Sequence, residues 1–231
     1  MRPNANQWKP RLLIGSMSIL ALCINSHFLG KVEAKRIQEV KQQEIQVQVA
    51  EEKKTAQNAA AEHAQFVARY VSGNFAAKTG NRNVAVAVAT EDVKLDRAIT
   101  TALVRRFQKE SAHVLSPFFK PEFVSDGLFQ EAFNGSGEPF GKLDLARSLD
   151  GVVLAQLDVQ YAQNATLENV ISATMQLKVT VVPVSNPAGG QTWTFTAYGP
   201  GFSKEVARKA AEDLLIKQIT NDTNMSLDAI P

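Results

Sequence analysis

The sequence is poor in the residues from which most catalytic and metal sites are built. It has one cysteine and three histidines among 231 residues. Because Cys23 lies in a hydrophobic N-terminal stretch, the rest of the chain has no thiol for a disulfide, a nucleophile or a metal site. His27, His63 and His113 are scattered, so no i, i+4 metal-binding pair exists. We therefore predict no catalytic, cofactor-binding or metal-binding residues.

A strong charge of one sign is also missing. The formal net charge is +2, with ten Lys/Arg and six Asp/Glu in residues 1–70 and fifteen against seventeen in residues 71–231. A slightly acidic C-terminal part lacks the basic patch that binds a polyanion. Nucleic acid is therefore not an expected partner.

The N-terminal residues favour a membrane anchor. Basic residues without acids precede the apolar run Leu12–Ile24, whose 13 residues have the length of a signal peptide. Extension to Gly30 approaches the roughly 20 residues that span a bilayer. No good cleavage site follows this run, and Leu22 is too large for the residue that precedes a lipidated cysteine at Cys23. We therefore predict that segment 1–30 is a signal or a membrane anchor. As an anchor it holds the chain in the membrane through residues 12–30. A single-pass protein with its domain in the periplasm or outside is preferred, and a secreted or lipidated form is the alternative.

Residues 31–72 predict a helical stalk. Glu, Gln, Lys and Ala dominate, and neither proline nor glycine occurs between Lys31 and Tyr70, which favours one long solvated helix. Ile37, Val40 and Val47 begin a heptad spacing that acidic residues soon interrupt, so self-association as a coiled coil is the second interpretation. A shift to β-branched composition places the domain boundary near residue 80.

Residues 80–220 predict one α/β (α+β) domain with a single mixed sheet of about five strands in the order β-α-β-α-β-β-β-α. Val-rich or alternating runs indicate strands at 83–89, 113–115, 152–161, 170–184 and 192–198. Leu95, Ile99, Leu103 and Phe107 form one face of a helix. A Gly-rich loop over 134–141 and a short helix over 143–149 precede the third strand, a helix capped by Ser203 closes the domain, and residues 221–231 are expected to be a disordered tail.

The order of helices and strands in the domain resembles that of a known family. The Leu149–Leu154 entry to the third strand, and the sequence Tyr198-Gly199-Pro200-Gly201 before Ser203 and an Ala-rich helix, are similar to the periplasmic domains of the curli-secretion lipoprotein and the penicillin-binding-protein activator lipoproteins. The resemblance implies a periplasmic α/β domain over about residues 83–219. The chain departs from that pattern in its lipoprotein site and in its stalk.

Aromatic residues are the one unusual feature of the domain. Half of the twelve phenylalanines fall between residues 118 and 140: Phe118, Phe119, Phe123, Phe129, Phe133 and Phe140. They form either part of the core or an exposed patch that binds a partner.

The prediction for function is a non-enzymatic cell-envelope accessory or assembly protein. Its domain binds an envelope protein partner or a second copy as a homo-oligomer, through the sheet edge or the aromatic segment. The alternative is an envelope hydrolase using acids such as Glu138 and Asp144, or a glycan- or lipid-binding domain, built on the 118–144 region.

Overall fold

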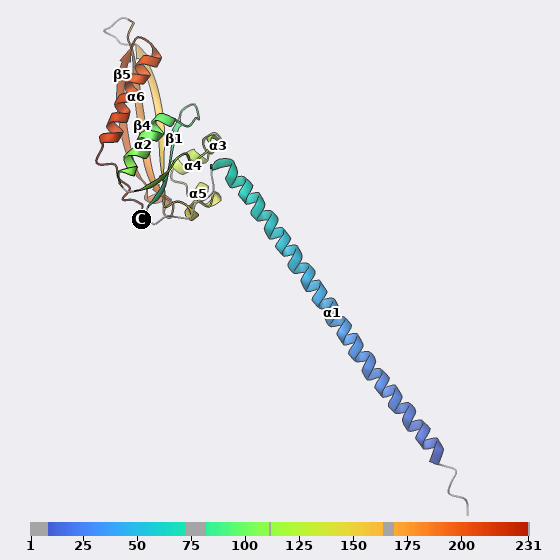
Figure 1. Cartoon of the computed structure of the whole chain (residues 1–231). Helices are drawn as coiled ribbons and strands as arrows, with labels where there is room; N and C mark the ends of the chain where they lie inside the picture. The colour runs from blue at the N-terminus through green and yellow to red at the C-terminus, as the bar shows by residue number, and fades with distance from the viewer. Residues whose placement is uncertain (1–8, 73–81, 111, 164–168, 231) are drawn as a thin grey trace, which may run out of the picture. The chain divides into compact units, whose positions relative to one another are not determined.

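The computed structural model describes residues 9–72, 82–110, 112–163 and 169–230 (Figure 1). The chain divides into two compact units, residues 1–61 and 62–231. Helix α1 runs from Lys9 to Tyr70. From residue 40 to residue 61 its side chains are exposed, including the apolar Val40 and Val47. The described side chains in this part of the helix are therefore solvated, and its role as a stalk stays a prediction.

The predicted transmembrane span is not supported. Within the part of the chain that the structure describes, no helix is both long and apolar enough to cross a membrane. The side chains of residues 9–35 and 37–39 lie outside that description, and the anchor predicted over 12–30 and Cys23 fall among them. Only the helical backbone of this segment is described.

The second unit is built on one mixed five-stranded sheet, as predicted. Its order is β2-β1-β3-β4-β5, in which β1 is parallel to β2 and β3, and the other pairs are antiparallel. The strands are β1 Asn83–Thr90, β2 His113–Leu115, β3 Gly151–Gln163, β4 Ile171–Pro183 and β5 Gln191–Gly201. Since both faces of β1 are buried, its Val/Ala composition is that of a strand covered on both sides.

Two helices cover one face of the sheet. Asp96 caps α2 (Arg97–Gln108) by accepting from the backbone N–H of Ile99 at 2.9 Å, and Ser203 caps α6 (Lys204–Asn221) in the same way. Helix α6 packs tightly on β5, because Gly199 and Gly201 leave no side chain between the strand and the helix backbone. Figure 1 shows α6 lying along β5 and β4.

The opposite, aromatic face is covered by short helices. These are α3 Pro121–Ser125, α4 Leu128–Phe133, α5 Glu138–Lys142 and the 3-10 turn η1 Leu145–Arg147. The last residues of α1 pack with them. A second 3-10 turn, η2 Pro187–Gly189, lies between β4 and β5. The predicted loop over 134–141 therefore contains a helix, because Pro139 suits a first helical turn. The helix predicted over 143–149 is instead a single 3-10 turn.

The prediction of a disordered tail over 221–231 is wrong for the described residues. Met225, Leu227 and Ile230 are fully buried in the core beneath α2 and α6. Gly151 makes room for Ile230, since a side chain there would overlap it.

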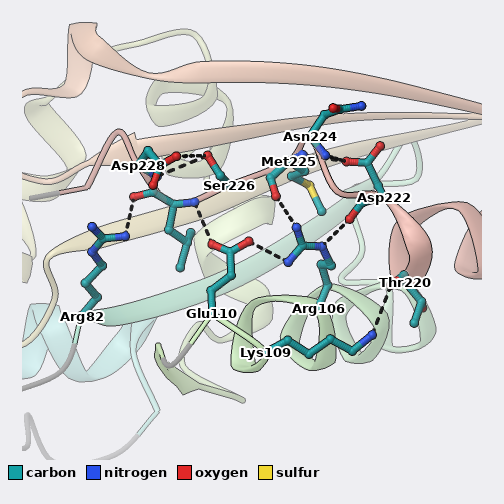
Figure 2. A network of polar contacts seen from close by, with 11 residues as sticks. Arg82, Arg106, Lys109, Glu110, Thr220, Asp222, Asn224, Met225, Ser226 and Asp228 are labelled. Atoms are coloured by element: carbon teal, nitrogen blue, oxygen red, sulfur yellow. Dashed lines mark hydrogen bonds and ion pairs between the residues drawn. The ribbon is translucent and has the colours of Figure 1, made fainter.

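Helix α2 holds this segment through the polar network in Figure 2. Arg106 donates from Nε to the carbonyl oxygen of Asp222 at 2.8 Å and from Nη2 to that of Met225, and it pairs with Glu110 at 2.6 Å. Glu110 in turn accepts from the backbone N–H of Leu227 at 3.0 Å. A charged pair formed by α2 and the turn that follows it therefore satisfies the backbone of a segment that has no regular structure of its own.

Candidate functional site

The six phenylalanines of the aromatic segment belong to the core. Each of them is at most 8 % exposed, so the interpretation as an exposed patch is wrong for these rings. The first five, from Phe118 to Phe133, form a continuous series of ring contacts, in which Phe119 stacks on Phe123 at 4.1 Å between centroids and Phe129 stacks on Phe133 at 5.7 Å. The hydrophobic effect drives this packing because α3, α4 and the end of α1 together exclude water from the rings.

The polar residues considered for catalysis have separate structural contacts. His63 Nε2 lies 3.0 Å from the carbonyl oxygen of Lys142, and His113 Nδ1 lies 3.0 Å from Oδ1 of Asn83. A hydrogen bond and ion pair with Lys142 lower the pKa of Glu138, which disfavours that carboxyl as a general acid. Asp144 pairs with its helical neighbour Arg147 at 3.4 Å.

Sequence reasoning missed one pair of carboxyl groups. A hydrogen bond to Asp158 and its negative charge raise the pKa of Glu91, just beyond the end of β1. The Asp158 carboxylate also accepts from Gln160 Nε2 at 3.0 Å. Among the described residues, no group of three His, Cys, Asp or Glu side chains comes together to hold a metal ion. The pair lies outside the 118–144 region on which the alternative hydrolase was predicted.

The outer edge of β5 is the sheet's longest unpaired edge in the described residues. The carbonyl oxygen of Thr196 accepts from Nε2 of Gln218 at 3.1 Å, so this carbonyl points away from β4. Backbone groups alternate along a strand, so Thr192, Thr194 and Tyr198 also direct theirs outward. Over residues 191–199 the strand carries no charge and no proline, the devices that usually protect an edge from pairing.

Helix α6 adds an apolar flank to this edge. Its central stripe, Ala207 to Ile219, is buried on the sheet. One flank faces α2, because Arg208 lies 3.9 Å from Asp96 and Thr220 accepts from Lys109. The opposite flank carries Gln218 and therefore follows β5. This flank holds residues spaced by four, Val206, Ala210, Leu214 and Gln218, and the exposed Phe202 precedes the helix. We call it the β5–α6 edge.

The β5–α6 edge exposes large apolar side chains that a soluble surface rarely gathers in one row. Phe202 is 82 % exposed, Val206 55 % and Leu214 46 %. Val206 and Leu214 therefore leave an apolar surface on α6 beside the outer strand of the sheet.

The flank is also complementary to a second copy of itself in antiparallel orientation. A two-fold axis at Ala210 places Val206 against Leu214 of the other copy, and Ala210 against its own equivalent. The neighbouring row of Glu205, Lys209, Asp213 and Lys217 alternates in sign. Across that axis each of these residues lies about as near to a like charge as to an opposite one, and within one chain Lys209 pairs with Asp213 at 2.9 Å.

Comparisons with known proteins give likenesses at the level of the fold. The chain is similar to a hypothetical protein of Chlamydia trachomatis (12 % identity, TM-score 0.38, covering 61 % of this chain and 94 % of that one). It is also similar to a lipoprotein of Neisseria meningitidis (13 %, 0.29, 61 % and 99 %). A third similar structure is a protein of Xanthomonas campestris from the family DUF330 (14 %, 0.27, 65 % and 86 %). No family model and no curated protein matches the sequence, and no specific family is confirmed.

Proposed function

We propose that this chain is a non-enzymatic accessory protein of the cell envelope whose α/β domain assembles with a second copy of itself. The observation that carries the proposal is the β5–α6 edge, which combines an unpaired strand with an exposed apolar flank that can meet its own equivalent in antiparallel orientation. Two-fold symmetric contacts are the commonest form of protein self-association.

The dimensions of the fold support this contact. In the proposed dimer β5 lies beside its equivalent, and the two α6 helices lie side by side on the same face. Strands are about 4.8 Å apart in a sheet and packed helices about 8–10 Å apart. A helix seated over β4 and β5 therefore meets its symmetry mate at an ordinary packing distance. The small side chain of Ala210 at the crossing point favours close approach.

Cysteine crosslinking tests the geometry of the contact. In a Cys23→Ser background of the full chain, Ala210→Cys is expected to form a disulfide-linked dimer under mild oxidation. The matched control is Arg208→Cys, whose exposed position lies on the opposite flank of the same helix, facing α2. Equal yields of dimer for the two variants would contradict the proposed contact.

Sedimentation equilibrium of the wild-type chain tests whether the dimer forms. If the wild-type chain is monomeric and crosslinks to another envelope protein in cells, the β5–α6 edge binds that protein and not a second copy.

The envelope location belongs to the same proposal and is tested separately. Anchoring through residues 12–30 places the domain outside the cytoplasm. Added protease is then expected to cleave the domain in spheroplasts, where it is accessible, while it is spared in intact cells with an outer membrane. Sequencing the mature N-terminus distinguishes a retained anchor from a cleaved signal and from lipid attachment at Cys23.

A further inference from the structure

A slot opens in the sheet beside β1 because its neighbour β2 is short. Strand β1 has eight residues, but β2 pairs only with Asn83, Val84 and Ala85. The ladder ends at Leu115 because Pro117, two residues later, has no N–H to donate. The chain then turns across the sheet toward α3. Between Ala85 and Val88, whose carbonyl oxygen accepts from the backbone N–H of Asp96 at 2.8 Å, the outer side of β1 therefore faces a space rather than a strand.

This space is a pocket of about 750 Å³. Val86 of β1 lines it, with the turn Val93–Asp96, the first turns of α2 around Arg97 and Thr101, and the segment from Ser116 to Pro121. Phe118 and Phe119 contribute to one wall. The volume falls within the range of small-molecule binding sites, and the apolar walls with a few polar groups are typical of such sites.

The polar groups around the pocket carry an excess of positive charge. Lys94, Arg97 and Lys120 line it, and Asp96 is the one acidic residue in the lining. The Asp96 carboxylate is already engaged, since it accepts from the N–H of Ile99 at 2.9 Å. In the described residues, neither Lys94 nor Arg97 forms an ion pair. The N-terminal end of the twelve-residue helix α2 adds partial positive charge at the same place.

The rim of the pocket is also strained. Val93 has φ of 59°, a left-handed conformation that is unfavourable for a β-branched side chain, and half of its surface is exposed. Backbone strain of this kind concentrates at binding sites, where the surrounding structure holds it in place. An exposed apolar side chain is thus held at the mouth of the pocket.

We infer that the pocket binds a small amphiphile with one anionic headgroup, a carboxylate or a phosphate. The headgroup lies at the rim between Lys94 and Arg97, and the apolar body lies against Val86, Phe118 and Phe119. This assignment follows from charge complementarity at the rim and from the apolar walls beneath it. It is independent of the β5–α6 edge, which lies at the other end of the strand order.

Calorimetric titration of the full chain tests the inference, with decanoate below its micelle concentration as the probe. Saturable binding of one decanoate per chain is expected. Decanol and decyltrimethylammonium share the apolar body without the negative charge, and are expected to bind at least about tenfold more weakly, because they lose charge-assisted hydrogen bonds. Equal binding of the three compounds, binding of several decanoates per chain, or no binding of decanoate would overturn the assignment.

Substitutions locate the site. The double variant Lys94→Gln and Arg97→Gln is expected to weaken decanoate binding about tenfold, while the matched exposed pair Lys53→Gln and Lys54→Gln on α1 is expected to leave it unchanged. Thr101→Trp places an indole in the pocket and is expected to abolish binding, with the urea midpoint confirming that the variant folds. Binding that survives both the double variant and Thr101→Trp would show that decanoate binds elsewhere.

Discussion

The close packing of α6 on β5 can be tested by adding one methyl group to the strand. In Gly199→Ala the added Cβ would lie 2.8 Å from the carbonyl carbon of Ala210 and closer still to backbone atoms of Ala207 and Ala211. Backbone cannot rotate away as a side chain can, so the helix must move outward by roughly 1 Å to restore ordinary contact distances. Overpacking of this kind costs about 1–3 kcal/mol, and the rigid neighbours here favour about 3 kcal/mol.

Urea unfolding followed by circular dichroism measures this loss. With a slope of about 2 kcal/mol per molar urea, the midpoint of Gly199→Ala is expected to fall by about 1.5 M. Gly141→Ala is the matched control, because its Cβ would meet no atom within 4 Å in helix α5. That variant is expected to gain about 0.5–1 kcal/mol from reduced freedom of the unfolded chain. Equal midpoints for the two variants would refute the close packing of α6 on β5.

Three further outcomes follow from the described contacts. Leu227→Ala is expected to lower the free energy of unfolding by about 2–5 kcal/mol, whereas Asn224→Ala, at an exposed neighbouring position, should change it by less than about 0.5 kcal/mol. Equal small losses for the two variants would support a disordered tail instead. Arg106→Met leaves its buried partners unpaired, with an expected loss of about 3–5 kcal/mol in the same assay. Burial, and secondly a hydrogen bond to Asp126, raise the pKa of Tyr70, so its proton is held longer in the folded state and stability falls as pH rises above about 10. An absorbance titration should show a late tyrosinate step that Tyr70→Phe removes.

The sheet could be predicted from sequence because its signals are local. Alternation along 170–184 and 192–198, and the Val-rich run at 83–89, identify strands without knowledge of their neighbours. Strands β1, β3 and β5 run slightly longer than predicted, to Gln163 in β3 for example, because pairing with a partner extends a strand beyond the residues that show its pattern, whereas β4 is one residue shorter at each end.

The burial of the tail and of the aromatic segment could not be predicted without the tertiary structure. Met225, Leu227 and Ile230 follow neither a helical nor a strand period, so their burial depends on a polar clamp from Arg106, 119 residues before Met225. The phenylalanine cluster indicated strong packing, but its exposure depended on which other elements cover it. The prediction of a partner-binding patch at those rings failed for this reason.

The surfaces proposed for binding depend on register. The flank of α6 that follows β5 is identified by the contact of Gln218 with Thr196, while the helical pattern alone leaves both flanks equivalent. The slot beside β1 exists because β2 pairs with only three of its residues. Its cations, Lys94, Arg97 and Lys120, come from segments that a sequence pattern does not bring together.

The buried tail also determines when the domain can fold. During synthesis, at roughly 5–20 residues per second, most domains fold from their N-terminal part onward. Here the core under α2 and α6 cannot close before residues 225–230 are available, because those residues fill it. Until then the uncharged β5 segment is exposed in an unfolded chain. The core of the second unit therefore closes only after residues 225–230 have been made, and until then a holding chaperone is expected to keep the β5 segment from aggregating.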